Sequence, residues 1–148
     1  MSGFLNKAAT SFLLTIILVF ISGPIFGAVL EVGKGKRCAT INEALNQAKD
    51  NDTVVIFSGV YKEGNIRITR PLTIIGRDWP VLDGLNKTEI ITVRASNVNI
   101  SGLVLKDCAQ GSMNDPAAIP VAEASNVRII GNRLQNNFFG IFLQYAKH

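Results

Sequence analysis

The chain has 148 residues, 47% of them hydrophobic, and a net charge of +4. This balance excludes an intrinsically disordered chain and allows a single domain with a hydrophobic core. The basic residues stand alone between apolar positions, without interleaved aromatic residues, so they predict a solvated outer face and no nucleic-acid partner.

The first 27 residues form a separate segment. Lys7 precedes an apolar run, residues 12–21, which is interrupted only by Thr15 and is ended by Gly23-Pro24. This order is typical of a secretory signal peptide, so we expect residues 1–27 to be removed on export. The apolar run has about half of the ~20 residues that a bilayer-spanning helix needs. An uncleaved membrane anchor is the alternative.

A strand and one helix are predicted to open the exported domain, residues 28–148. The strand covers residues 29–32 and is followed by a glycine-rich, basic loop. Thr40 and Glu43 have the spacing of a capping box, and apolar residues recur behind them with helical periodicity at Ile41, Ala44, Leu45 and Ala48. At the front of a β-solenoid such a helix covers the open end of the first coil, so we interpret it as an N-terminal cap.

The centre of the chain is a repeat. Residues 91–103 and 119–131 have nearly the same sequence, and in each copy alternating apolar residues lie on both sides of an Ala-Ser-Asn bend. Gly102 and Gly131 occupy equal places in the two copies, 29 residues apart, and residues 72–76 form a third near-copy. A repeat of this length predicts stacked coils of short strands. The apolar residues recur at every second position, whereas the repeats of a helical solenoid would show an apolar period near 3.6 residues. A helical solenoid is therefore excluded.

We therefore predict an all-β fold, a parallel β-helix with one N-terminal capping α-helix. The strands of its first coil are expected at residues 53–57, 60–64 and 66–68. A loop from Cys108 to Pro116 lengthens a later coil, and residues 140–143 form a further partial turn. The apolar edge of that last turn predicts self-association, because uncovered strands recruit other chains.

Equal places in successive coils are expected to stack vertically. Asn97 and Asn126 hold the same place before a Val-x-Ile strand, so their amides are predicted to form a structural ladder. The same alignment predicts in-register pairs within the strands, namely Val98 with Val127 and Ile100 with Ile129.

Several short blocks, in this order and spacing, resemble the N-terminal part of the NosD family of β-helix proteins. The blocks run from about residue 29 to the end and cover residues 39–45, 52–54, 59–61, 71–76, 80–84, 132–134 and 139–141. The resemblance implies a right-handed, pectin-lyase-like β-helix in the periplasm. It also implies a non-enzymatic accessory role in assembling the copper–sulfur cluster of nitrous-oxide reductase. The family's chains are much longer, so we expect this chain to be truncated at its C-terminus.

The resemblance further implies partners: an ABC-type membrane transporter, and nitrous-oxide reductase or its copper chaperone. The copper ligands available in this chain are few, and no pair of them has ligand spacing; they are Cys38, Cys108, Met113 and His148. A thiolate–thioether site between Cys108 and Met113 is one interpretation, and a Cys38–Cys108 disulfide is another. Cys38 is expected to pack beside the cap helix. We therefore assign no metal site, and expect copper only transiently or at a partner interface.

Carbohydrate chemistry on a β-helix would require neighbouring carboxylates. Asp83, Asp107, Asp115 and Glu123 are predicted to lie on different turns or loops, where surface charge and turn capping explain them. Arg94, Asp107 and Arg128 are candidates to line one face, but no catalytic residue is assigned. Two alternatives stay open beside the maturation factor. One is the N-terminal fragment of a pectinesterase, lyase or epimerase, and the other is a carbohydrate-binding surface solenoid.

Overall fold

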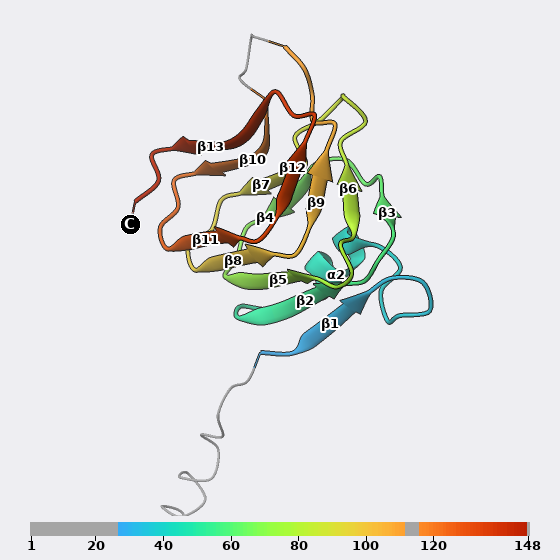
Figure 1. The fold of residues 1–148 in the computed structure, drawn as a ribbon. Coiled ribbons are helices and arrows are strands. Elements are labelled where there is room, and N and C mark those ends of the chain that lie inside the picture. The colour runs from blue at the N-terminus through green and yellow to red at the C-terminus, as the bar shows by residue number, and fades with distance from the viewer. Residues whose placement is uncertain (1–26, 112–115, 148) are drawn as a thin grey trace, which may run out of the picture.

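A computed structural model describes residues 27–111 and 116–147 of the chain, which form a parallel β-solenoid (Figure 1). Sheet A has five strands: β1 (Val29–Val32), β2 (Asp52–Ile56), β5 (Leu72–Gly76), β8 (Val98–Ser101) and β11 (Val127–Ile130). Sheet B has four: β3 (Val60–Tyr61), β6 (Val81–Asp83), β9 (Val104–Lys106) and β12 (Arg133–Gln135). Sheet C also has four: β4 (Ile66–Ile68), β7 (Ile91–Val93), β10 (Ala117–Ala122) and β13 (Phe139–Gln144). The predicted all-β parallel coil architecture is confirmed.

Successive coils pair in parallel, because each strand lies beside its equivalent one turn later. The inward positions of sheet A form one aliphatic column, which runs through Leu30, Val54, Ile74, Ile100 and Ile129. Burial of such columns supplies the driving force that a single coil lacks. The first coil is made of β2, β3 and β4, as expected; β4 has the expected ends, and the ends of β2 and β3 differ from the prediction by at most three residues.

The repeat is in the predicted register. Val127 pairs with Val98 and Ile129 pairs with Ile100. Val98 and Ile100 are fully buried, whereas Val127 and Ile129 are partly buried against the same core. The difference arises because Val127 and Ile129 belong to the last described strand of sheet A, which no further coil covers.

Glycines hold one corner of the coils close together. Gly76 and Gly102 come directly after the paired residues Ile75 and Ser101 and so lie one above the other in successive coils. A Cβ atom built on Gly76 would overlap the carbonyl oxygen of Gly102. The Gly102 N–H in turn donates to the Gly131 carbonyl at 3.2 Å. Gly76 and Gly102 are therefore packing requirements, whereas Gly131, which has open space at its Cβ position, is favoured only by its left-handed φ of 62°.

The predicted cap helix is α2 (Ile41–Gln47). Thr40 is its N-cap, with Oγ1 accepting from the Glu43 N–H at 3.1 Å, and the Glu43 carboxylate accepts from the Ala39 N–H at 2.8 Å. Ile41 and Ala44 are fully buried against the first coil. Ala48 is buried at the C-cap and Leu45 packs on the core from a partly buried position. The helix covers the start of the solenoid, as its amphipathic pattern predicts (Figure 1).

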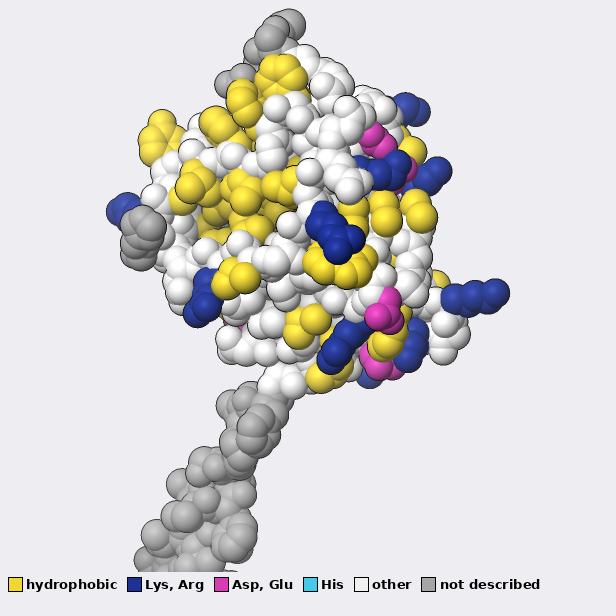
Figure 2. All heavy atoms as spheres, in the orientation of Figure 1, with side chains coloured by type: hydrophobic (Ala, Val, Ile, Leu, Met, Phe, Trp, Pro, Cys, Tyr) yellow, Lys and Arg dark blue, Asp and Glu magenta, His cyan; other side chains and the backbone are white. Residues whose placement is uncertain are grey.

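The opposite end of the solenoid is apolar and open. Figure 2 shows a hydrophobic area at this end of the molecule. In Figure 1, drawn in the same orientation, β11, β12 and β13 surround that area. The partial turn predicted from residues 140–143 is part of β13, which pairs with β10 and places Ile141 beside Ile119. Ile141 and Leu143 remain 43% and 63% exposed.

The predicted signal peptide, residues 1–27, lies outside the described residues except for Gly27. Within the described ranges, no helix has the length and apolar character needed to cross a membrane.

Candidate functional site on the outer face of sheet B

Charged side chains from successive coils meet on the outer face of sheet B. Asp83 ends β6 and pairs in register with Lys106, which ends β9. The Lys106 ammonium lies 3.3 Å from an oxygen of Asp83 and 2.7 Å from an oxygen of Asp107. From the next coil, the Asn136 amide donates to the other oxygen of Asp107 at 2.5 Å. We call these four residues the Lys106 cluster.

Local backbone geometry holds the two carboxylates of the cluster in place. Asp83 also accepts from the N–H of Leu85 at 2.9 Å, which caps the turn that leaves sheet B. Asp107 has a left-handed φ of 56° and donates its own N–H to the Gln135 carbonyl at 3.2 Å. Asp83 is only 8% exposed, so its charge requires the partner that Lys106 supplies.

At neutral pH both Asp107 and Lys106 are charged, because each shifts the pKa of the other away from neutrality. The hydrogen bond from Lys106 is the main cause that lowers the pKa of Asp107, and the bond from Asn136 adds to it. The bonds to Asp107 and then to Asp83 raise the pKa of Lys106. A general acid needs a carboxyl whose pKa is raised toward neutrality. The pKa of Asp107 is lowered instead, so this carboxylate is suited to accepting hydrogen bonds rather than to donating a proton.

The other end of the same sheet carries an exposed aromatic residue. Trp79 precedes β6, is 42% exposed, and has a left-handed φ of 57°. The guanidinium carbon of Arg133, on β12, lies 3.7 Å from the centre of the indole ring. An exposed indole beside fixed charges is a surface on which a polar ligand with an apolar face can bind.

The sequence prediction for the carboxylates is partly wrong. Asp83 and Asp107 lie on different turns, as expected, but the coil stacking brings both to Lys106. Glu123 lies apart from them, exposed just after β10 of sheet C. Asp115 is outside the described residues. Turn capping is confirmed for Asp83, whereas surface charge is wrong for it because the side chain is buried.

The expectation that Arg94, Asp107 and Arg128 line one face is also wrong. Arg94 follows β7 of sheet C, Asp107 follows β9 of sheet B, and Arg128 lies within β11 of sheet A. Three sheets form the three sides of the coil, so these residues belong to different sides. Lys106 and Asn136, which do contact Asp107, were not singled out. Asp107 and Asn136 hold the same position in successive coils, and their separation of 29 residues equals the repeat length, so an alignment of the two coils predicts this contact.

The copper-ligand candidates are not brought together. Cys38 and Cys108 are both free and buried, which excludes the disulfide interpretation in this structure. Cys38 packs beside the cap helix, as expected, with the Gln47 amide 3.7 Å from its sulfur. Met113 and His148 lie outside the described residues. Within residues 27–111 and 116–147, no three histidine, cysteine, aspartate or glutamate side chains are grouped as metal ligands.

Cys108 has a structural environment at the base of the inserted loop. Its sulfur accepts the Phe138 N–H at 3.2 Å, and its thiol donates to the Ala109 carbonyl at 3.3 Å. The backbone N–H of Cys108 donates to the Asn137 side chain at 3.0 Å. These bonds fix Cys108, at the start of the inserted loop, to the following coil.

Comparison with known proteins gives no family or relative. No family model matches the chain, and neither a curated protein nor a solved structure matches it. Function is therefore inferred from the geometry and from the ordered sequence blocks.

Proposed function

We propose that this chain is a non-enzymatic periplasmic accessory protein that serves copper-site maturation of nitrous-oxide reductase together with an ABC-type transporter. The observation that supports the proposal is the ordered resemblance to the NosD family, now located on the fold. The blocks at residues 52–54, 59–61, 71–76 and 80–84 lie in β2, β3, β5 and β6 or at their ends. Those at residues 132–134 and 139–141 overlap β12 and the start of β13. They are therefore the strand and corner residues of one continuous solenoid, which we expect to wind right-handed.

A scaffold role is favoured by the Lys106 cluster. Its best-placed carboxylate, Asp107, has a lowered pKa because Lys106 and Asn136 bind it. Acid–base catalysis on a glycoside would require one carboxyl to stay protonated near neutral pH. The cluster instead presents fixed charges on a rigid sheet face, which suits docking to another protein.

Copper is cargo in this proposal and not a resident cofactor. The two cysteines are buried and separate, so we place the copper-handling groups on the partners or at the interface with them. Titration of the purified chain with Cu(I) under a competing chelator should show no stoichiometric binding. One stoichiometric copper that is lost in Cys108→Ser would move the copper site into this chain.

The maturation role itself is tested in the source organism. Deletion of the gene should leave nitrous-oxide reductase without its catalytic copper cluster, seen as lost nitrous-oxide reduction and an altered visible spectrum of the purified enzyme. The wild-type gene should restore both. A fully loaded reductase in the deletion strain would overturn the proposal.

A second candidate function is carbohydrate binding, which is favoured by Trp79. Its indole carries the Arg133 guanidinium over the ring and is 42% exposed on the face of the Lys106 cluster, and exposed aromatic side chains of this kind bind sugar rings. Affinity electrophoresis in gels that contain soluble polysaccharides would show retardation that Trp79→Ala removes. Leu85→Ala is the matched control, since Leu85 is 41% exposed and has a similar left-handed φ of 56°.

A further inference from the structure

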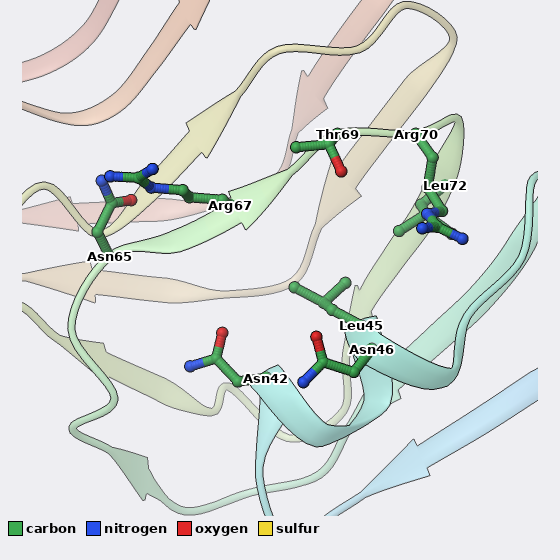
Figure 3. A pocket seen from close by; sticks show the side chains of 8 residues that line it. All are labelled: Asn42, Leu45, Asn46, Asn65, Arg67, Thr69, Arg70 and Leu72. Atoms are coloured by element: carbon green, nitrogen blue, oxygen red, sulfur yellow. The ribbon is translucent and has the colours of Figure 1, made fainter.

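A polar cavity lies between the cap helix and the first coil, and it shares no residue with the Lys106 cluster. It has a volume of about 270 Å³ and is open to solvent. One wall is formed by α2, and the other by β4, the following turn and the start of β5. Its lining residues are Asn42, Leu45, Asn46, Asn65, Arg67, Thr69, Arg70 and Leu72 (Figure 3).

The lining carries two positive charges and no negative one. Arg67 and Arg70 are the only ionisable residues among the eight that line the cavity. Within the described part of the chain, neither guanidinium has a carboxylate within 4.0 Å. Two unneutralised guanidinium groups beside one small cavity attract an anion.

Arg70 is held in place by the fold. One of its guanidinium nitrogens donates to the Ala48 carbonyl at the C-cap of α2, at 2.6 Å. A guanidinium has five N–H donors, so this bond leaves most of them free for a ligand. Arg67 is exposed on the outer side of β4, and Figure 3 shows its guanidinium beside the Asn65 amide.

Two carboxylates that contact lining residues, Glu63 at Asn42 and Glu89 at Asn65, hydrogen-bond to neutral groups. Glu63 accepts the N–H groups of Ile41 and Asn42 at 2.7 and 2.9 Å. Glu89 accepts the Thr92 hydroxyl at 2.8 Å and the Asn65 amide at 3.3 Å. Among the described residues, neither carboxylate forms an ion pair with Arg67 or Arg70, so both guanidinium groups remain available to a ligand.

Neutral hydrogen-bonding groups complete the lining. Figure 3 shows the Asn42 and Asn46 amides rising from α2 toward the cavity, and the Thr69 hydroxyl directed to it from the opposite wall. Amides and hydroxyls bind the oxygen atoms of a small polar molecule, and the guanidinium forks bind its charge. The modest volume restricts the ligand to a small one.

We infer that this cavity is a binding site for a small oxyanion, a phosphate or a carboxylate. Figure 3 shows the two guanidinium groups at opposite ends of the lining, so Arg67 is the charge-recognising residue and Arg70 adds positive charge at the other end. The site is separate from the proposed maturation role and does not depend on it. It lies at the junction of the cap helix and the first coil, so an occupied site adds contacts between these two elements.

The experiment is an NMR titration of the purified chain with three probes: inorganic phosphate, glucuronate and uncharged glucose. Saturable shifts of the backbone amides of α2 and β4 are expected with at least one of the two anions and not with glucose. Phosphate alone or glucuronate alone would identify the type of oxyanion. Arg67→Gln should weaken the binding roughly tenfold or more, because it removes a charge-assisted hydrogen-bonding group.

The matched control is Arg128→Gln, which removes the same charge from an exposed position on sheet A. This variant should bind as the wild type does. Arg67 is exposed, so its replacement is compatible with folding, which the dispersion of the amide spectrum checks. Shifts that do not saturate with either anion, equal binding of glucose, or equal loss in the two arginine variants would each overturn the inference.

Discussion

The side-chain amide of Asn126 donates a 2.7 Å hydrogen bond to the amide oxygen of Asn97, one coil below it. Both residues have left-handed backbone geometry, with φ of 53° and 57°. Asparagine tolerates this conformation better than other residues that have a Cβ atom. The ladder therefore fixes the bend of each copy in two ways, through the backbone and through the side chain. Ser96 and Ser125 add a second link at 3.0 Å.

Replacement of Asn97 separates these two contributions. Asn97→Ala should lower the free energy of unfolding by about 1–2 kcal/mol, since alanine disfavours a positive φ and lacks the acceptor. Asn97→Gly should lower it less, by about 0.5–1 kcal/mol, because glycine accepts the backbone conformation. Urea unfolding curves measure both. An alanine variant as stable as the wild type would show that the bend is not strained.

Glu63 is predicted to be the main stabiliser of the cap helix. Its two carboxylate oxygens accept the N–H groups of Ile41 and Asn42, the first residues of α2. Glu63→Gln should lower the free energy of unfolding by about 1–2 kcal/mol, because one acceptor and the charge at the helix N-terminus are lost. Glu43→Gln is the control, since Glu43 accepts a single bond from Ala39 that an amide oxygen can also accept. Equal urea midpoints for the two variants would contradict the assignment.

The sequence predicted the coils well because the core is repetitive. Alternate apolar residues and the Gly102–Gly131 spacing determine which side of each strand is buried, and the observed pairing follows that register. The helix was predictable because Thr40 and Glu43 are close in sequence. Glu63 was missed as its cap because it is 22 residues from Ile41 and only the stacking of the coil brings it there.

Contacts across coils were harder to predict than the coils themselves. Asp83 and Lys106 meet because a particular pairing of β6 with β9 places them side by side. Without that register, Asp83 is only a turn residue in the sequence. The anion cavity depends on two elements as well, since Asn42 and Arg67 come from α2 and β4. Motifs within one strand or helix could be predicted, and sites between two of them could not.

The Lys106 cluster should make stability depend on pH at both extremes. The pKa of Asp107 is lowered in the folded chain from its ordinary value of 3.8, so its contribution is present above that value and is lost as pH falls through the folded pKa. The pKa of Lys106 is raised above 10.5, so its contribution is present below that value and is lost as pH rises through the folded pKa.

Asp107→Asn tests the acidic limb. The difference in urea midpoint between this variant and the wild type should be largest near neutral pH and should shrink below pH 3.8, toward the folded pKa. The same comparison in a Lys106→Gln background is the control. There the pH dependence should be weaker, because the main cause of the lowered pKa is absent. A difference that is constant across pH would contradict the coupling.

The open end of the last coil is predicted to mediate self-association. Ile129, Ile141 and Leu143 line an apolar hollow there, and Leu143 is 63% exposed. Uncovered strands and apolar ends of a solenoid recruit further chains. The mass measured by size-exclusion chromatography with light scattering should therefore rise above that of a monomer as protein concentration increases.

Leu143→Lys should shift this equilibrium toward the monomer, since a charge in the hollow opposes burial of the end. Val60→Lys is the matched control. Val60 is 61% exposed, but it lies in β3 of the first coil, at the opposite end of the solenoid from Leu143. Its mass distribution should equal that of the wild type. The contact would have to lie elsewhere if both lysine variants dissociated equally. A wild-type chain that stays monomeric at every concentration would show that the apolar end alone does not drive association.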